Sequence, residues 1–111
     1  MKKQEQIKVN TYVENIVNDI NALTRTLERP IIWQQLYRCS ADTCIVNGNW
    51  ILLKSYSTIV AAYNAYTGEL FDFLRLVYGY TATSAQHIAK FRNYCRSVTG
   101  HDCTIYRWYA V

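Results

Sequence analysis

The stretch from Thr11 to Leu27 constrains the fold most, because its apolar residues recur at the spacing of one α-helical face. The residues that share this face are Tyr12, Val13, Ile16, Ile20, Leu23 and Leu27. Pro30 marks the end of the helix, because the residue before a proline avoids helical backbone angles. A stripe this regular has to be buried. We expect it to pack against a sheet of the same chain, with a second copy of the helix as the alternative.

The residues after Pro30 predict a set of antiparallel strands. Asn47-Gly48 is the strongest hairpin signal, because both central positions of the favoured two-residue turn need a positive φ. Residues 31–38 fit either a strand or continued helix, and we favour a strand, followed by a turn at 40–43. The further strands are expected at residues 44–46, 50–56, 58–63 and 69–78, with a loop at 64–68.

A second helix is predicted over residues 83–98. Gly79 interrupts the strand before it, and Thr83 with Gln86 three residues later forms a capping-box pattern. The apolar residues that recur at helical spacing are Ile88, Phe91, Cys95 and Val98. Gly100 is the expected end of this helix, and a last strand is expected at residues 103–109.

These elements predict a single α+β domain over residues 1–111. The expected order is an N-terminal helix at 1–29, a β-meander at 31–80, a helix at 83–98 and a last strand at 103–109. We expect one antiparallel sheet with both helices on the same face, which is the simplest packing. A chain of 111 residues is large enough for one modest core.

The charge is mildly basic. Twelve Lys and Arg stand against eight Asp and Glu, which gives a net charge of +4. This balance excludes an acidic mimic of DNA, and it falls short of the dense cationic surface of a dedicated nucleic-acid binder. The sequence contains no apolar run of signal-peptide or membrane-spanning length, so we expect a cytoplasmic protein that does not contact membranes.

The four cysteines do not indicate a metal centre. Their spacings, together with His87 and His101, match no familiar zinc ligand set, so we expect no metal and no cofactor. Free thiols are favoured, and a Cys39–Cys44 or Cys95–Cys103 pair stays open. Cys95 and His101 form the only candidate nucleophile–base pair. Because Cys95 lies on the apolar stripe, where a thiol is unreactive, we predict that the protein is not an enzyme.

Two segments together resemble a known family. Leu53-Lys-Ser-Tyr-Ser-Thr-Ile-Val-Ala61 and Gly79-Tyr-Thr-Ala-Thr-Ser-Ala-Gln-His-Ile-Ala-Lys-Phe91 are similar to a small uncharacterised domain of bacteriophages and mobile elements of Gram-positive bacteria. Its members carry Ser-Tyr-x-Thr followed by Tyr-Ser-x-Thr-Thr-x-x-His-x-x-x-Phe. The positions that match the second motif are Tyr80, Thr83, His87 and Phe91, while Thr81 and Ser84 change the residue but keep a hydroxyl. The resemblance covers roughly residues 50–108.

The second motif has two interpretations. Hydroxyls at a helix N-terminus can hold an anion, because the first amides there are unpaired. The anion-binding residues would then be Thr81, Thr83, Ser84 and His87. The structural interpretation, which we favour, is that Thr83 caps the helix, Phe91 packs into the core, and a half-buried His87 bonds a neighbouring strand.

The resemblance implies a phage or mobile-element protein, and we predict that it inhibits a host defence nuclease in the manner of an anti-CRISPR protein. The expected partner is a host protein such as a CRISPR effector nuclease or its guide-loaded complex. We expect this chain to bind it as a monomer or a homodimer. The predicted contact residues are Arg92, Arg96, Tyr66 and Trp108. The alternative is a small nucleic-acid-binding regulatory protein that uses helix 83–98, where Arg92 and Arg96 share a face and Lys90 points elsewhere. Tyr94 and Arg107 complete that alternative surface.

Overall fold

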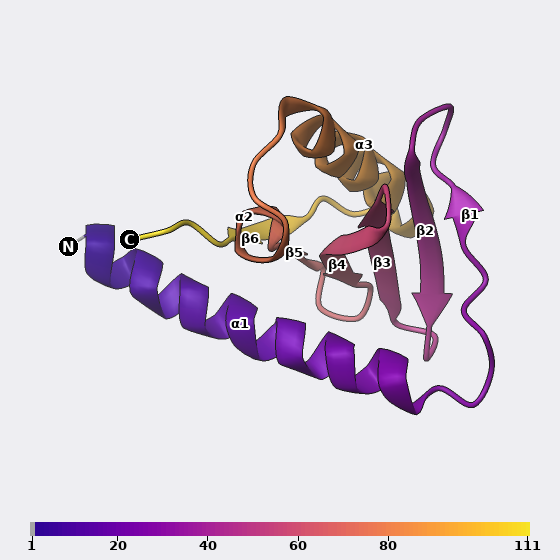
Figure 1. Ribbon diagram of the computed structural model, residues 1–111, viewed down its shortest axis with the longest axis horizontal. Helices are drawn as coiled ribbons and strands as arrows, with labels where there is room; N and C mark the ends of the chain where they lie inside the picture. Colours follow the sequence, from indigo (N-terminus) through magenta and orange to yellow (C-terminus); the bar gives the residue numbers. More distant parts are fainter. Residues whose placement is uncertain (1) are drawn as a thin grey trace.

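The computed structural model, which describes residues 2–111, has three layers: a helix, a six-stranded sheet and a second long helix (Figure 1). The strands lie in the order β1-β2-β3-β4-β5-β6, so each strand pairs with its neighbours in sequence. The predicted α+β class is confirmed. The strands are β1 (Gln34–Gln35), β2 (Ala41–Val46), β3 (Trp50–Ser55), β4 (Thr58–Asn64), β5 (Glu69–Asp72) and β6 (Thr104–Arg107). The helices are α1 (Lys2–Thr26), α2 (Leu74–Val77) and α3 (Ala82–Thr99).

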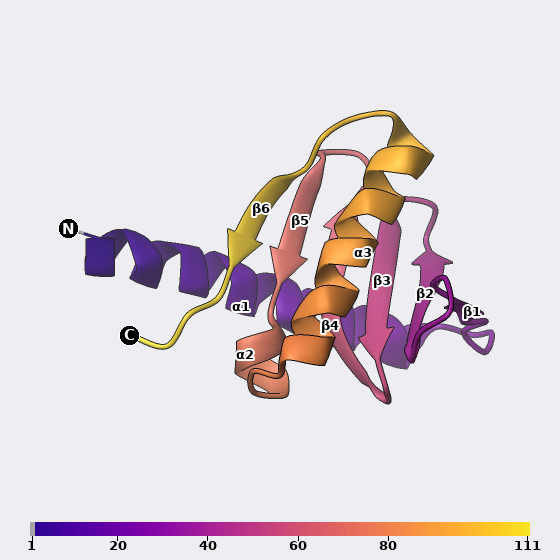
Figure 2. The same cartoon turned by 90° about the horizontal axis from the view of Figure 1, so that it is seen from above.

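The two long helices cover opposite faces of the sheet, so the expectation of a shared face is wrong (Figure 2). The alternation of side chains along β3 shows the reason. Ile51 and Leu53 face the cluster that includes Phe91 of α3, whereas Leu52 between them faces the cluster that includes Val13 of α1. A strand buried on both faces needs a cover on each side.

The sheet is not antiparallel throughout, because β6 runs parallel to β5. The other four pairings are antiparallel, as predicted. The chain leaves β5 at one end, crosses the face of the sheet as α3, and re-enters beside β5 in the same direction (Figure 2). Parallel neighbours need a crossover of this kind, usually a helix. The meander therefore ends at β5.

The strand predicted over residues 69–78 is correct only as far as Asp72. The Asp72 carboxylate accepts a hydrogen bond of 3.1 Å from the backbone N–H of Leu74, which turns the chain into α2. Gly79, with φ of 90°, donates its backbone N–H to the carbonyl of Leu74. Gly79 therefore ends a helical turn and does not interrupt a strand.

The long helices are confirmed, but the end of the first and the start of the second differ from the prediction. The helix predicted over 1–29 spans Lys2–Thr26, and Met1 lies outside the described residues. The N-cap of α3 is Thr81, whose Oγ1 accepts from the backbone N–H of Ser84 at 3.1 Å. The predicted cap at Thr83 is therefore wrong by two residues, because Thr81 already supplies the acceptor. Gly100 ends α3 with φ of 75°, as predicted.

The turns follow the sequence signals with one exception. Asn47 and Gly48 have φ of 52° and 76° and join β2 to β3, which confirms the predicted hairpin. The strand predicted over 31–38 shrinks to Gln34–Gln35, and residues 41–43 of the predicted turn form the start of β2. The chain turns earlier, near Tyr37, where φ is 55°. The expected last strand at 103–109 is present as Thr104–Arg107.

The C-terminal segment is held by polar side chains of α1. The side-chain amide of Asn10 donates to the carbonyl of Tyr109 at 2.6 Å and accepts from the N–H of Tyr109 at 3.1 Å. Gln6 donates to the carbonyl of Arg107 at 2.9 Å. Asn10 is buried, so these bonds satisfy a side chain that would otherwise be costly there.

Candidate functional site

The two segments of the family resemblance meet inside the molecule. The hydroxyl of Ser55, at the end of β3, lies 2.8 Å from Nδ1 of His87 and 2.9 Å from the hydroxyl of Ser84 on α3. All three side chains are buried, and the ring of Tyr56 lies against the imidazole with 5.7 Å between centroids. The network joins a strand to the helix that covers it. His87 therefore bonds a strand as predicted, but it is buried rather than half-buried.

The burial of His87 makes stability depend on pH. Desolvation, and to a smaller degree the nearby charge of Lys90, lowers the pKa of His87 below its usual value. The unfolded chain then binds the proton more readily, so acid favours unfolding. The stability contribution of neutral His87 is complete above about pH 6.5 and is lost as the pH falls below it, with a limiting slope of about 1.4 kcal/mol per pH unit.

We expect the urea midpoint to fall between pH 7.5 and pH 5.5, and we expect His87→Gln to flatten that fall. Glutamine can bond Ser55 but does not titrate in this range. His101→Gln is the matched control, because it makes the same substitution at an exposed histidine. Equal slopes for the His87→Gln variant and the unaltered protein would contradict this assignment.

The four residues of the predicted anion site do not converge on one point. Thr81 caps α3, and Thr83 is exposed. Ser84 and His87 turn inward to Ser55. The anion-binding role stays a prediction, while the structural interpretation accounts for the contacts of Thr81, Ser84 and His87. Phe91 is fully buried, as that interpretation expects.

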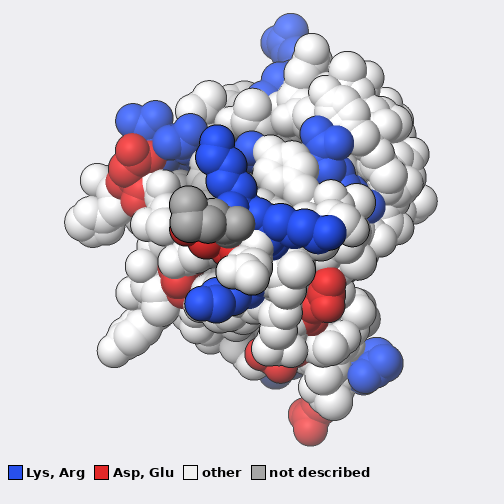
Figure 3. All heavy atoms as spheres, turned by 90° about the vertical axis from the view of Figure 1, so that its left-hand side faces the viewer, with Lys and Arg blue, Asp and Glu red and all other residues white. Residues whose placement is uncertain are grey.

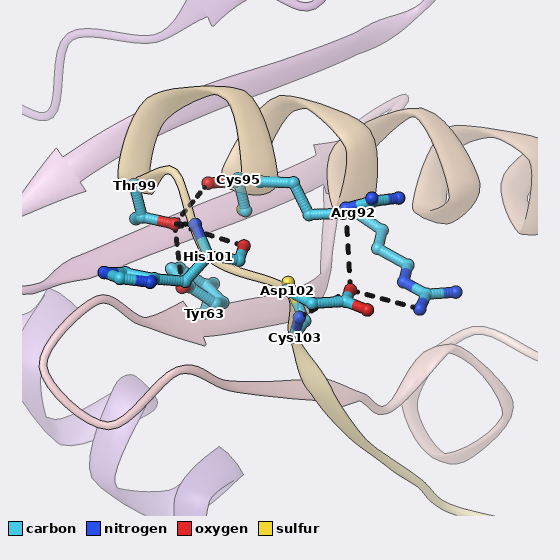
Figure 4. Close-up of polar contacts among 8 residues, drawn as sticks. Tyr63, Arg92, Cys95, Thr99, His101, Asp102 and Cys103 are labelled. Atoms are coloured by element: carbon cyan, nitrogen blue, oxygen red, sulfur yellow. Dashed lines mark hydrogen bonds and ion pairs between the residues drawn. The ribbon is translucent and has the colours of Figure 1, made fainter.

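The predicted contact residues divide between separate places. Arg92 and Arg96 of α3 both face Asp102, with N–O distances of 3.3 and 3.5 Å, and Figure 4 shows Arg92 beside Asp102. The N–H of Cys103 and then the two guanidiniums lower the pKa of the Asp102 carboxyl. Tyr66 is 88% exposed in the 64–68 loop. Trp108 packs on the α1 side and donates to Glu14 at 2.8 Å.

A cavity of about 390 Å³ opens between α2, α3 and the strands β5 and β6. We call it the arginine cavity, because three arginines line it: Arg75, Arg92 and Arg107. Its aliphatic lining residues are Leu70, Leu74, Ala85, Ile88, Ala89 and Ile105. Its other lining residues are Asp72, Tyr80, Asn93 and Tyr109. The volume lies within the range of about 300–1,000 Å³ that is typical of ligand pockets.

Arg75 is the least neutralised cation of the arginine cavity. Its guanidinium carbon lies 4.4 Å from the ring centroid of Tyr80 and 5.1 Å from that of Tyr109. Among the described residues it forms no ion pair. A cation–π contact uses no N–H hydrogen bond, so the N–H groups of Arg75 remain able to donate to an acceptor. Arg75 is therefore placed to bind an anion.

The other two arginines are partly neutralised. Nε of Arg107 lies 2.7 Å from Oδ2 of Asp72, and Nη1 donates to the hydroxyl of Tyr109 at 3.3 Å. These bonds, to Tyr109 and then to Asp72, raise the pKa of Arg107, so it stays charged. Arg92 pairs with Asp102 through Nη2, while its buried Nε–H has no acceptor within the described residues. Three arginines and one aspartate give the lining a net charge of 3 − 1 = +2.

Figure 3 looks at the side of the molecule where α2 and both chain ends lie in Figure 1. Lys and Arg side chains gather near the middle of this face, and fewer acidic side chains lie beside them. This face of the molecule therefore carries more basic than acidic side chains near its middle.

The sequence did not single out Arg75 or Tyr109 as site residues. Tyr80 is part of the second motif of the family resemblance. Arg75 fell within a predicted strand, and only the turn at α2 brings it to Tyr80 and Tyr109. Arg75 and Tyr80 precede α3 in the sequence, whereas Tyr109 follows β6. No local sequence pattern therefore predicts that the three residues meet.

The other candidate chemistry lies away from this cavity. Cys95 is fully buried, and desolvation raises the pKa of its thiol, so it is not activated. All four cysteines are free thiols. Within residues 2–111, no group of three or more His, Cys, Asp or Glu could hold a metal ion.

Comparisons with protein-family models, with curated proteins and with solved structures give no match to this chain. In the part of the chain that the structure describes, no helix has the length and apolar character needed to cross a bilayer.

Proposed function

We propose that this chain is a non-enzymatic binding protein that attaches through the arginine cavity to an acidic surface of a host defence nuclease and inhibits it. The arginine cavity is the observation that carries this proposal. Arginine and tyrosine dominate the hot spots of protein interfaces, and a basic surface steers an acidic partner into place. The resemblance to a phage and mobile-element domain supplies the host nuclease as the target.

The lining of the arginine cavity supports binding rather than catalysis. It includes no serine, threonine, cysteine or histidine. Its aspartate, Asp72, already bonds Arg107 and the backbone of Leu74. The buried Ser55–His87 contact lies outside the lining and joins two layers of the fold.

The site of attachment differs in part from the one predicted. Arg92 belongs to both, whereas Arg96, Tyr66 and Trp108 lie outside the cavity lining. Arg75, Tyr80 and Tyr109 take their place in the proposal. Replacing both Arg92 and Arg96 with glutamate would place two new carboxylates beside Asp102 and disturb the loop after α3. Arg75 is the better position for a test, because it is exposed and has no carboxylate partner among the described residues.

The test is an affinity capture from lysate of a Gram-positive host, split into nuclease-treated and untreated halves. We expect one defined nuclease to be retained in both halves and to lose cleavage activity when the purified protein is added. Arg75→Glu should weaken this inhibition by at least about tenfold, which corresponds to about 1.4 kcal/mol.

Arg38→Glu is the matched control, because Arg38 is an exposed arginine between β1 and β2, away from the cavity lining. It makes the same change of charge and should leave inhibition intact. Equal inhibition by the Arg75→Glu variant and the unaltered protein would refute the proposed surface.

A nucleic-acid-binding role is the second candidate, and the rings of Tyr80 and Tyr109 beside Arg75 favour it. Single-stranded nucleic acid binds where bases stack on aromatic rings and phosphates meet cations. Helix α3 alone supports it less, because Arg92 and Arg96 share Asp102. Retention only in the untreated half of the lysate would favour this candidate over the inhibitor.

A further inference from the structure

We propose that the arginine cavity is a binding site for a phosphorylated nucleoside. The inference rests on the proposed function only in sharing its cavity, and it concerns a small ligand rather than a protein partner. Three features of the lining carry it: excess positive charge, two aromatic rings beside Arg75, and several aliphatic side chains.

The charge selects a phosphate. The lining has a net charge of +2 from Arg75, Arg92 and Arg107 against Asp72. A phosphate monoester carries about −1.5 to −2 near neutral pH and offers three acceptor oxygens, whereas a carboxylate carries a single charge. Guanidinium groups present paired N–H donors that match phosphate oxygens. The N–H groups of Arg75 are donors that such a ligand could use.

The aromatic rings and the aliphatic side chains of the lining favour a nucleoside phosphate over inorganic phosphate. Tyr80 is 52% exposed, so part of its ring is available for stacking with a base. Leu74, Ile88 and Ile105 give the cavity an apolar wall. Inorganic phosphate would leave both surfaces in contact with water. A ligand with a flat base and a phosphate uses all three features at once, and the volume of about 390 Å³ gives room for one nucleotide.

The test is isothermal titration of the purified full-length protein with each of the four common ribonucleoside monophosphates, with the parent nucleosides, and with inorganic phosphate. We expect at least one monophosphate to bind more tightly than both its nucleoside and phosphate. Equal affinity for the monophosphate and inorganic phosphate would reduce the cavity to a simple anion site and overturn the inference. An absence of heat with all four monophosphates would also overturn it.

Two variants test the assigned contacts. Arg75→Gln removes a cation, and Tyr80→Ala removes an aromatic ring. Each variant should bind the monophosphate with an affinity lower by about tenfold. The controls are Arg38→Gln and Tyr37→Ala, which make the same changes at exposed positions in the β1–β2 connection. Unchanged affinity in both cavity variants would place the nucleotide elsewhere and refute the site.

A 5′-phosphorylated dinucleotide separates two sources of the ligand. Affinity equal to that of the monophosphate would support recognition of a strand end, and weaker affinity would support a free nucleotide. These titrations use no nuclease. A failed titration with intact nuclease inhibition therefore overturns only the nucleotide site, and the reverse result overturns only the proposed function.

Discussion

Replacing Phe91 with alanine is expected to lower the free energy of unfolding by about 3–5 kcal/mol. Phe91 is fully buried on the inner side of α3, in the cluster with Leu53, Val60 and Leu70. Removing the ring loses its transfer from water and leaves a cavity that the strands cannot fill. Because domains of this size are stable by about 5–15 kcal/mol, the loss is a large share of the total.

Urea unfolding followed by circular dichroism measures this effect. Val98→Ala is the matched control, since Val98 lies on the same helix and is 52% exposed. It should change stability by no more than about 0.5 kcal/mol. Similar losses for the two variants would contradict the packing of α3 through Phe91.

Replacing Asp72 with alanine is expected to cost about 2–3 kcal/mol of unfolding free energy, because it removes two bonds of a buried carboxylate. Asp72 holds Arg107 at 2.7 Å and the Leu74 N–H at 3.1 Å. The first bond joins β5 to β6, and the second starts α2. Arg107 is 41% exposed, so water compensates part of the lost ion pair and keeps the cost below that of a fully buried pair.

The same urea experiment checks the Asp72→Ala effect. Asp19→Ala on the exposed side of α1 also removes one carboxylate and should stay within about 0.5 kcal/mol. A loss of that small size for Asp72→Ala would show that the carboxylate does not fix the β5–α2 turn.

Local signals were sufficient to predict most of the elements. Asn47-Gly48 specifies its hairpin by backbone conformation alone, and Gly100 does the same for the end of α3. The arrangement of the layers was harder to predict, because an apolar stripe shows that a helix face is buried but not which side of the sheet buries it. The run Ile51-Leu52-Leu53 was the available sign of a sheet covered on both faces.

The site could be predicted only in part for the same reason. His87 and Phe91 follow from the helix pattern, since their partners lie directly beneath α3. The contact of Arg75 with Tyr109 joins residues on either side of the crossover, and it depends on β6 running parallel to β5. That direction is a property of the whole topology, so no window of sequence around Arg75 indicates it.

The hydrogen bonds from α1 to the C-terminal segment limit strand addition at one edge of the sheet. An edge strand normally offers unpaired backbone groups to another chain. At the end of β6 and just after it, the side-chain amides of Gln6 and Asn10 already bond backbone groups of Arg107 and Tyr109. At the opposite edge, β1 has only two residues. Both margins of the sheet are poor templates for strand addition, so the proposed partner would have to be contacted through side chains.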